Sequence, residues 1–397
     1  MRIDLLFPAL PPALDGIGDY TAYLAKALVP HGYVRILTAQ RGAAPIAEVE
    51  LLEAFQTTPL GFRSLKELTG ATDWLILQYN PFSYGRYGFN PVLPEALSAL
   101  KSAQPSLRIA VMVHEPFVPL STWRFAIMTS WQRWQLWRLG HVTDLVFCAI
   151  EPWTRTLRPY VASGVPLVAL PVGSNIPDAG FERQDARDRL SIEEGEFVVG
   201  VFGSARRLLG FIKTAVDRLT AEVHPLRVLY AGPDGAKLRA VLTDKPLLDL
   251  GPLPAEEVSR ALRAMDVHLA PYPRGVSARR GAFIAGLQHG VPTISTLGDH
   301  TDPFIRLMKD SAFVLASEHD ADEFAEAALG LAKDPVRCRR MAVAAREMHD
   351  RHFCWSRIAE QLIHVLQSTS SVQSLRHEAA DRDVTLPERT STVEEGL

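Results

Sequence analysis

The sequence predicts an α/β protein made of two domains, each with a parallel sheet that helices cover on both faces. Short apolar runs of strand length alternate with longer amphipathic segments of helix length, as they do in doubly wound sheets. This alternation pauses at residues 171–197, a polar stretch with Pro, Gly, Ser and Asn that is typical of a linker. The chain has 397 residues, which is enough for two buried cores.

The strands of each domain are expected at the short runs of mainly apolar residues. In the first half these runs are 3–7, 34–37, 74–77, 108–113, 145–149 and 166–170. After the linker they are 198–202, 226–231, 247–250, 267–270, 293–295 and 313–315. Apolar residues at helical spacing, such as Tyr20, Leu24 and Leu28, predict the helices between them. Closing helices are expected over 337–350 and 355–367, followed by a polar, flexible tail at 368–397.

The charge balance and the cysteines exclude several classes of protein. Lysine and arginine number 42 against 45 aspartates and glutamates, and a net charge of −3 gives no reason to expect nucleic-acid binding. Cys148, Cys338 and Cys354 are far apart and have the spacing of neither a disulfide framework nor a zinc site. Since neither a leader-like start nor an apolar run of membrane-spanning length is visible, we expect a cytoplasmic protein.

A glycine-rich turn follows the first expected strand and opens the first long helix. It contains Gly16, Ile17 and Gly18. Glycines let the backbone approach a ligand closely, and the N–H groups at a helix start face an anion such as a diphosphate. The alternative is an ordinary turn in which Asp19 or Thr21 caps the helix.

A histidine and a glutamate follow the expected strand at 108–113. They are His114 and Glu115. Ligands of doubly wound sheets bind at the carboxyl ends of the strands, where His114 would donate to a sugar hydroxyl or phosphate oxygen. Glu115 would orient this histidine or an acceptor hydroxyl. The alternative is a strand end that carries a hydrogen-bonded structural histidine.

Two arginine pairs in the second half are candidate anion sites. Arg206 and Arg207 follow the expected strand 198–202 and precede a helix. A second pair stands in the loop after the expected strand 267–270, again directly before a helix. This loop contains Ser277, Arg279, Arg280 and Gly281. Guanidinium groups at a helix N-terminus combine charge with paired donors, which suits a diphosphate.

Four of the seven tryptophans lie in one segment that also contains arginines. They are Trp123, Trp131, Trp134 and Trp137. Residues 121–139 of this segment include no aspartate or glutamate. This helix would lie on a membrane interface or hold a lipid-linked acceptor, or it would pack its tryptophans into the core. The loop at 79–89 begins with Tyr79 and Asn80 and is rich in aromatic rings. These rings would stack on a sugar or acceptor, or pack within the loop.

Taken in order, these motifs resemble those of the retaining glycosyltransferases of the GT-B fold, specifically glycosyltransferase family 4. The resemblance covers about residues 1–367. Its pieces are Gly16–Gly18, His114, the crossover at 171–177, and the segments 231–233, 251–253, 266–271, 290–296, 334–335 and 355–359.

The resemblance implies two Rossmann-like domains that face a cleft. Residues 1–178 would form the acceptor-side domain and residues 190–352 the nucleotide-sugar-binding domain, with a helix at 354–367 crossing back to the first. The implied reaction moves a sugar from a nucleotide-diphosphate sugar to a hydroxyl of a glycan, lipid-linked or small-molecule acceptor. It would proceed with retention and without a metal or a cofactor. Independently of the resemblance, composition and the Trp-rich segment predict a protein in the cytoplasm or peripherally at the inner membrane face.

The resemblance also implies a role for each candidate residue. His114 and Glu115 would be catalytic. The donor diphosphate would contact Gly16, Ile17, Gly18, Arg206, Arg207, Arg279, Arg280 and Gly281. The base would lie at Gly251, Pro252 and Leu253, the donor sugar or ribose at Ser277, and the acceptor at Tyr79, Asn80, Trp131 and Trp134.

The sequence departs from the family at four positions. The two glutamates that usually hold the donor sugar and the ribose are replaced by Ser277 and Ala285. The usual Arg and Lys that grip the diphosphate fall at Ser204 and Leu209, so neighbouring arginines would supply the charge. Two alternatives therefore stand beside the transferase: a non-catalytic homologue that binds a nucleotide or glycan, and a nucleotide-sugar epimerase.

Overall fold

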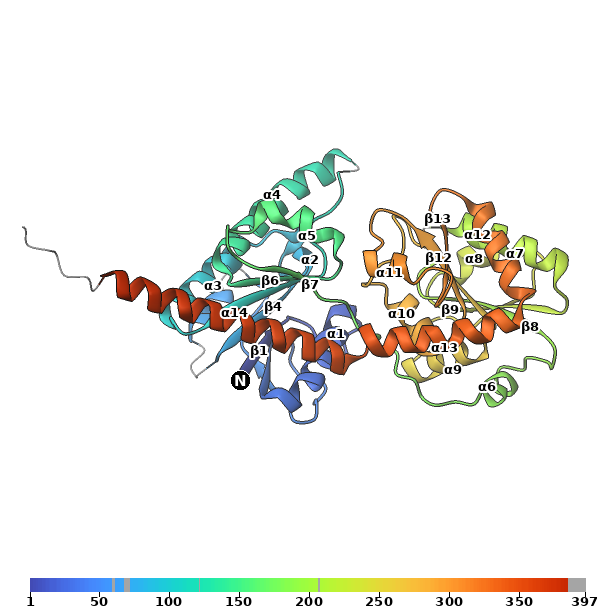
Figure 1. Cartoon of the computed structure of the whole chain (residues 1–397), viewed down its shortest axis with the longest axis horizontal. Helices are drawn as coiled ribbons and strands as arrows, with labels where there is room; N and C mark the ends of the chain where they lie inside the picture. The colour runs from blue at the N-terminus through green and yellow to red at the C-terminus, as the bar shows by residue number, and fades with distance from the viewer. Residues whose placement is uncertain (59–60, 68–71, 121, 206–207, 385–397) are drawn as a thin grey trace, which may run out of the picture.

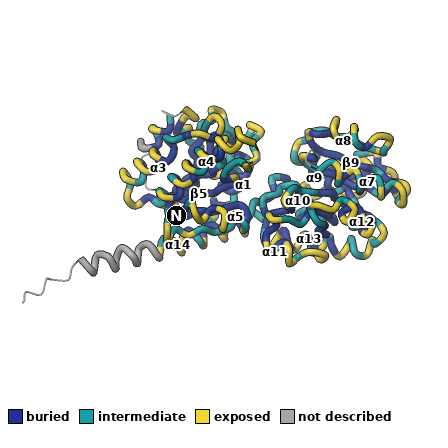
Figure 2. The backbone as a smooth tube through the Cα atoms, turned by 90° about the horizontal axis from the view of Figure 1, so that it is seen from above, coloured by how far each residue is buried: buried dark blue, intermediate teal, exposed yellow. Residues whose placement is uncertain are grey.

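The computed structural model describes residues 1–58, 61–67, 72–120, 122–205 and 208–384. It contains two lobes side by side, each a parallel sheet with helices on both faces (Figure 1). Buried residues gather inside each lobe, so each has a core of its own (Figure 2). The predicted two-domain α/β architecture is confirmed.

The first lobe is built on a seven-stranded sheet with the order β3-β2-β1-β4-β5-β6-β7 in the described residues. Its strands are β1 (Arg2–Leu6), β2 (Tyr33–Thr38), β3 (Glu50–Glu53), β4 (Trp74–Tyr79), β5 (Arg108–Val113), β6 (Leu145–Cys148) and β7 (Leu167–Ala169). The six strands that the apolar runs predict are confirmed. The short edge strand β3 was missed because two of its four residues are glutamates, a composition that protects an exposed sheet edge.

The helices of the first lobe connect these strands by crossovers. They are α1 (Gly16–Leu28), α2 (Pro81–Tyr84), α3 (Val92–Ala103), α4 (Trp123–Val142) and α5 (Pro152–Leu157). Short 3₁₀ turns η1 (Val29–His31), η2 (Gly61–Glu67), η3 (Arg86–Gly88) and η4 (Arg158–Tyr160) complete the connections. No helix in the described part of the chain is both long enough and apolar enough to cross a bilayer.

The second lobe repeats the plan with six strands in the order β10-β9-β8-β11-β12-β13, among the described residues. All six predicted strands are confirmed: β8 (Phe197–Phe202), β9 (Leu226–Ala231), β10 (Leu247–Asp249), β11 (Val267–Ala270), β12 (Thr293–Leu297) and β13 (Val314–Ser317). The helices are α6 (Arg183–Arg189), α7 (Leu209–Glu222), α8 (Gly235–Val241), α9 (Ala255–Ala264), α10 (Gly281–Gln288), α11 (Pro303–Leu307), α12 (Ala321–Ala332) and α13 (Pro335–His352).

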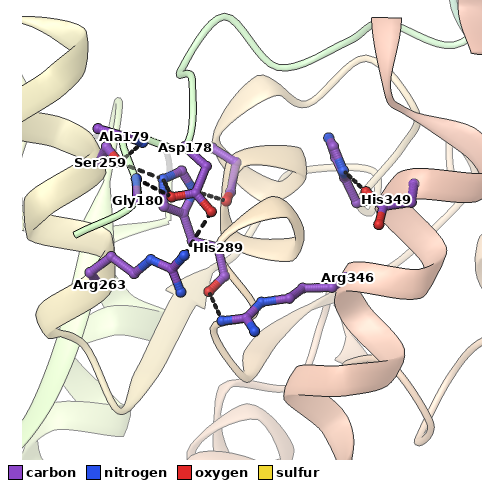
Figure 3. A network of polar contacts seen from close by, with 10 residues as sticks. Asp178, Ala179, Gly180, Ser259, Arg263, His289, Arg346 and His349 are labelled. Atoms are coloured by element: carbon purple, nitrogen blue, oxygen red, sulfur yellow. Dashed lines mark hydrogen bonds and ion pairs between the residues drawn. The ribbon is translucent and has the colours of Figure 1, made fainter. Parts of the chain in front are cut away.

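The linker is bonded to the second lobe by a buried polar network (Figure 3). The N–H of Ala179 donates to Ser259 Oγ over 3.0 Å, and Ser259 is bonded to His289 Nε2 over 2.8 Å. Asp178 accepts a 2.7 Å bond from Arg263. Because His289 Nδ1 can only donate to the carbonyl of Ala285, its Nε2 accepts the Ser259 proton, and burial lowers the pKa of this ring.

Helix α6 lies within the stretch that the sequence presents as a linker. It was missed because its residues are almost all polar, with Ala186 its one apolar residue. Ala186 is buried, and the guanidinium of Arg187 pairs with Asp266 at the start of β11. The segment is therefore helical because tertiary contacts with the second lobe support it, not because of its own periodicity.

Helix α14 (Trp355–Val384) crosses back to the first lobe, as expected (Figure 1). Its residues Ile358, Leu362 and Leu366 are part of the first lobe's core. The expectation of a flexible tail from residue 368 is wrong for its first part, since the helix continues to Val384. The hydroxyl of Thr369 is bonded to the carbonyl four residues earlier, and the residue itself is buried.

Candidate functional site

The site lies where the carboxyl ends of the two sheets face each other. The strand order reverses between β1 and β4 in one sheet and between β8 and β11 in the other. Ligands of doubly wound sheets bind outside such switch points. A cavity of about 380 Å³ lies over the second sheet and another of about 360 Å³ lies between the lobes. Both are lined by Glu115, Arg279 and Gly281.

An ion pair joins the two lobes at the boundary of these cavities. Arg279 Nη1 lies 2.9 Å from Glu115 Oε1, and the guanidinium of Arg279 stands over the ring of Trp153 at 4.7 Å. The arginine is largely buried, whereas the glutamate is half exposed. Two residues from distant parts of the sequence, both expected in the site, are thus brought into direct contact.

The second-lobe cavity is closed by the start of helix α10. Arg280 and Gly281 line it, and the guanidinium of Arg280 lies 4.8 Å from the ring centre of Tyr272. Burial raises the pKa of Tyr272 to about 12, so this ring is neutral. The N-terminus of a helix carries a partial positive charge, which adds to that of the arginines. This end of the cavity therefore suits an anion.

The rest of this cavity is mainly apolar. Its walls include Val201, Leu208, Ile212, Leu269 and Pro271. Ser204 is a polar exception, and its hydroxyl donates to Asp234 over 2.8 Å. A planar, partly apolar group attached to an anion fits such a pocket better than a fully charged ligand does.

His114 lines the cavity between the lobes and is held in one orientation. Its Nε2 lies 2.8 Å from Gln78 Oε1, and its ring stands edge-on to Tyr20 with 4.7 Å between the ring centres. Burial, with the nearby charge of Arg279, lowers the pKa of His114 to about 3. The ring is therefore neutral, with its proton on Nε2 and Nδ1 left as a hydrogen-bond acceptor.

The glycine turn before α1 is built differently from the expectation. Gly16 and Ile17 line the cavity between the lobes, whereas Gly18 packs against the backbone of Ala9. Asp15 caps the helix, and its carboxylate accepts the N–H groups of Ile17 and Gly18 over 2.8 and 2.9 Å. The alternative in which Asp19 or Thr21 caps is therefore wrong, and two of the expected anion donors already have a carboxylate partner.

A buried carboxylate, that of Asp302, also joins the lobes beside the site. Asp302 accepts the N–H of Glu151 in the first lobe over 2.6 Å and that of Ala278 in the second over 2.8 Å. Burial raises the pKa of Asp302 to about 6. Nothing in the sequence singles out Asp302, because only the docking of the lobes brings its two donors together.

Other expected site residues either fall outside the described part of the chain or do not line the cavities. Arg206 and Arg207 fall outside the described residues. Ser277 is fully buried, with no exposed surface from which to touch a sugar. Gly251, Pro252 and Leu253 follow β10 and line neither cavity.

The expected acceptor residues are also separated. Asn80 lines the cavity between the lobes, whereas the ring of Tyr79 is fully buried and its hydroxyl accepts from Gln135. Trp131 and Trp134 on α4 line neither cavity. The aromatic helix and the acceptor side of the cavity are thus different surfaces.

Six further residues line the cavity between the lobes and were not selected from the sequence as site residues. They are Tyr20, Ala149, Val172, Gly173, Asn175 and Trp355. Trp355 stacks on Tyr23 with 5.6 Å between ring centres and donates from Nε1 to the carbonyl of Ser174 over 2.8 Å. Asn175 lies in the linker and Trp355 begins the closing helix. Their place in the sequence therefore gives no indication that they line a cavity.

The architecture is similar to that of several solved structures, although the sequence matches no known family. No family model matches the chain, and no curated protein matches its sequence. A sucrose-phosphate synthase from Thermosynechococcus elongatus is 18% identical, with 94% of this chain and 100% of that chain covered and a TM-score of 0.70. HepE from Anabaena, solved with UDP-glucose, is 15% identical, with 93% and 100% covered and a TM-score of 0.64.

A third similar structure is that of WaaG, a glycosyltransferase involved in lipopolysaccharide biosynthesis. It is 15% identical, with 92% of this chain and 99% of that chain covered and a TM-score of 0.63. At such low identities the likeness concerns architecture, and it extends over both lobes and the crossing helix. The chain therefore has the GT-B fold.

Proposed function

We propose that this protein is a glycosyltransferase that moves a sugar from a nucleotide-diphosphate sugar to an acceptor hydroxyl. The observation that carries the proposal is the position of Arg279 and Arg280 at the start of α10, between an apolar pocket and the cavity that both lobes share. The apolar pocket would take the nucleoside and the arginines the diphosphate. UDP-glucose in the similar structure of HepE supports a donor of this kind.

The chemistry requires stabilisation of charge on the leaving diphosphate. As the bond between the anomeric carbon and the phosphate oxygen breaks, negative charge grows on that oxygen. Arg279, Arg280 and the N–H groups at the start of α10 would stabilise this charge. We propose that transfer needs no metal and proceeds with retention, as the family resemblance implies.

His114 would bind the reacting sugar rather than transfer a proton. Its neutral ring presents Nδ1 as an acceptor, so it can receive a hydrogen bond from a sugar hydroxyl. Glu115 would act on the acceptor. When a diphosphate takes Arg279 as its partner, the carboxylate is released and can accept the proton of the acceptor hydroxyl.

The acceptor would enter between the lobes, where Asn80, Tyr20 and Asn175 line the cavity. A glycan, a lipid-linked sugar or a small molecule with a free hydroxyl is compatible with such a lining. We propose that the protein meets this acceptor in the cytoplasm.

One observation favours a second candidate, a non-catalytic homologue that binds a nucleotide or glycan. Ser277 and Ala285 replace the glutamates of the family, and both are completely buried. Neither can therefore supply the usual contacts to the ribose and the sugar. Under this alternative the arginines would still bind a nucleotide diphosphate.

The test is a screen of UDP-, GDP-, ADP- and TDP-sugars, with and without acceptors, in which nucleotide release and sugar products are measured. Nucleotide release with sugar transfer or hydrolysis supports the proposal. Tight binding without turnover supports the non-catalytic homologue, and an epimerised donor without nucleotide release supports an epimerase.

The site assignment is tested separately by calorimetry with nucleoside diphosphates. Arg279→Ala and Arg280→Ala should each weaken binding at least about tenfold, because each removes a charge-assisted contact. The exposed Arg41→Ala is the matched control and should bind like the wild type. Unchanged affinity in both site variants would contradict the assignment.

A further inference from the structure

Helix α4 carries large apolar residues on its exposed face, where a surface helix normally carries polar ones. Its buried face combines the polar Thr129, Gln132 and Gln135 with Leu136 and Leu139. Five large apolar residues point outward: Trp123, Phe125, Ile127, Trp134 and Trp137 are exposed, Trp123 to 70%. The alternative in which this segment packs its tryptophans into the core is therefore wrong for three of the four.

The outward orientation is specified by hydrogen bonds on the buried side. Gln135 accepts the N–H of Asn90 over 2.7 Å and donates to the hydroxyl of Tyr79 over 3.2 Å. Gln132 accepts the N–H of Val118 over 2.9 Å and donates to a carbonyl of the loop after β4. Rotating the helix to bury the tryptophans would break these bonds and leave buried amides unpaired, which is costly.

A neighbouring loop extends the apolar surface. Phe82, Tyr87 and Phe89, in the segment after β4, are each about half exposed. Trp131 connects this loop to α4, because its Nε1 donates to the carbonyl of Tyr87 and its ring contacts that of Phe89. We call these three loop rings and the five exposed apolar residues of α4 the aromatic face.

The charge around the aromatic face has one sign. Residues 80–94 and 116–143 contain no aspartate or glutamate, and they contain four arginines, Arg86, Arg124, Arg133 and Arg138. Arg124 and Arg138 lie over the rings of Trp123 and Trp134, with 5.3 and 5.5 Å to the ring centres. The guanidinium groups of Arg124 and Arg138 thus each stand beside an exposed indole ring.

We propose that the aromatic face docks the protein onto an anionic lipid bilayer. Indole rings favour the boundary between headgroups and acyl chains, and arginines beside them pair with lipid phosphates. A second copy of this chain is a poorer partner, because a symmetric contact would place these arginines against one another with no acidic residue in either segment. The proposal does not depend on the glycosyl transfer proposed above.

The test is co-sedimentation of the full-length protein with vesicles of phosphatidylcholine, with or without phosphatidylglycerol. The wild type should bind the vesicles that contain phosphatidylglycerol, and the binding should weaken as salt is added. The variant Trp123→Ser, Trp134→Ser, Trp137→Ser should lose at least about tenfold in affinity. The variant Arg124→Gln, Arg138→Gln should lose about fivefold for each arginine on anionic vesicles.

The matched control places three serines on exposed apolar positions of the second lobe, at Leu307, Val336 and Val343. This control should bind vesicles like the wild type. Thermal unfolding of each variant shows whether it is folded. We expect all of them to fold, because none of the substituted side chains is buried. The proposal is overturned if the wild type stays in the supernatant at low salt, or if the tryptophan variant binds as well as the wild type. It is also overturned if the wild type dimerises through this face without binding vesicles.

Discussion

Arg279 of the second lobe and Glu115 of the first form an ion pair across the cleft, with 2.9 Å between Nη1 and Oε1. The pair lies where the two cavities meet, so a phosphate bound at the start of α10 competes with the carboxylate for the same guanidinium. The glutamate therefore opposes the binding of an anion to Arg279.

This competition predicts that Glu115→Gln tightens the binding of a nucleoside diphosphate. Removing a partly exposed carboxylate partner should raise affinity about threefold. Calorimetry with UDP, and with the other nucleoside diphosphates if UDP does not bind, measures the effect. Glu53→Gln, which breaks an exposed ion pair elsewhere, is the control and should change nothing. Weaker binding by Glu115→Gln would instead mean that the carboxylate itself contacts the ligand.

His114 is predicted to affect turnover rather than donor affinity. His114→Ala should lower kcat about a hundredfold, because it removes the acceptor proposed to bind the sugar, while the affinity for the nucleoside diphosphate stays unchanged. Because the pKa of His114 is lowered to about 3, the wild-type rate should show no titration of this ring between pH 5 and 8. An inflection near neutral pH that disappears in His114→Ala would contradict the neutral assignment.

Buried histidines should make the protein less stable in weak acid. Burial lowers the pKa of His268 to about 4, against an ordinary value of about 6.5. Between these values the unfolded chain binds one more proton than the folded chain. The free energy of unfolding should therefore fall as the pH falls, by about 1.4 kcal/mol per pH unit for this group.

Urea unfolding at pH 5 and pH 7 tests the contribution of His268. His268→Gln should reduce the pH dependence of the free energy of unfolding by the contribution of one proton. Equal pH dependence in His268→Gln and the wild type would show that the buried ring does not titrate as stated.

The crossing helix is predicted to need a glycine in the linker. A Cβ at Gly173 would lie 2.5 Å from the ring of Trp355, so Gly173→Ala must displace the tryptophan or the linker. We expect a loss of about 1–3 kcal/mol in the free energy of unfolding. Gly210→Ala is the control, since nothing lies within 4 Å of that position, and it should be neutral or slightly stabilising. Equal stability of the two variants would show that Trp355 is free to move.

The strands could be predicted because each is a run of apolar residues between polar helices, and a strand buried on both faces has that composition whatever its neighbours are. The edge strand β3 and the helix α6 lack such a signal. Both form because adjacent elements supply contacts to polar segments. For helix α4 the sequence leaves two orientations open, because its buried face includes amides that need specific partners from distant segments.

For the site, residue types and their place at strand ends were enough to select His114, Glu115, Arg279 and Arg280, all of which line the cavities. Their partners were not predictable. Gln78, which orients His114, stands 36 residues earlier in the sequence, and Glu115 is 164 residues from Arg279.

The sequence by itself determined two parallel α/β domains, the approximate place of the linker and the strand ends that carry the chemistry, because local composition and periodicity encode these features. Only the tertiary structure decided that Arg279 meets Glu115 and that α4 turns three of its four tryptophans outward. These depend on how distant segments dock, and the hydrogen bonds and ion pairs that fix the docking leave no periodic trace in the chain.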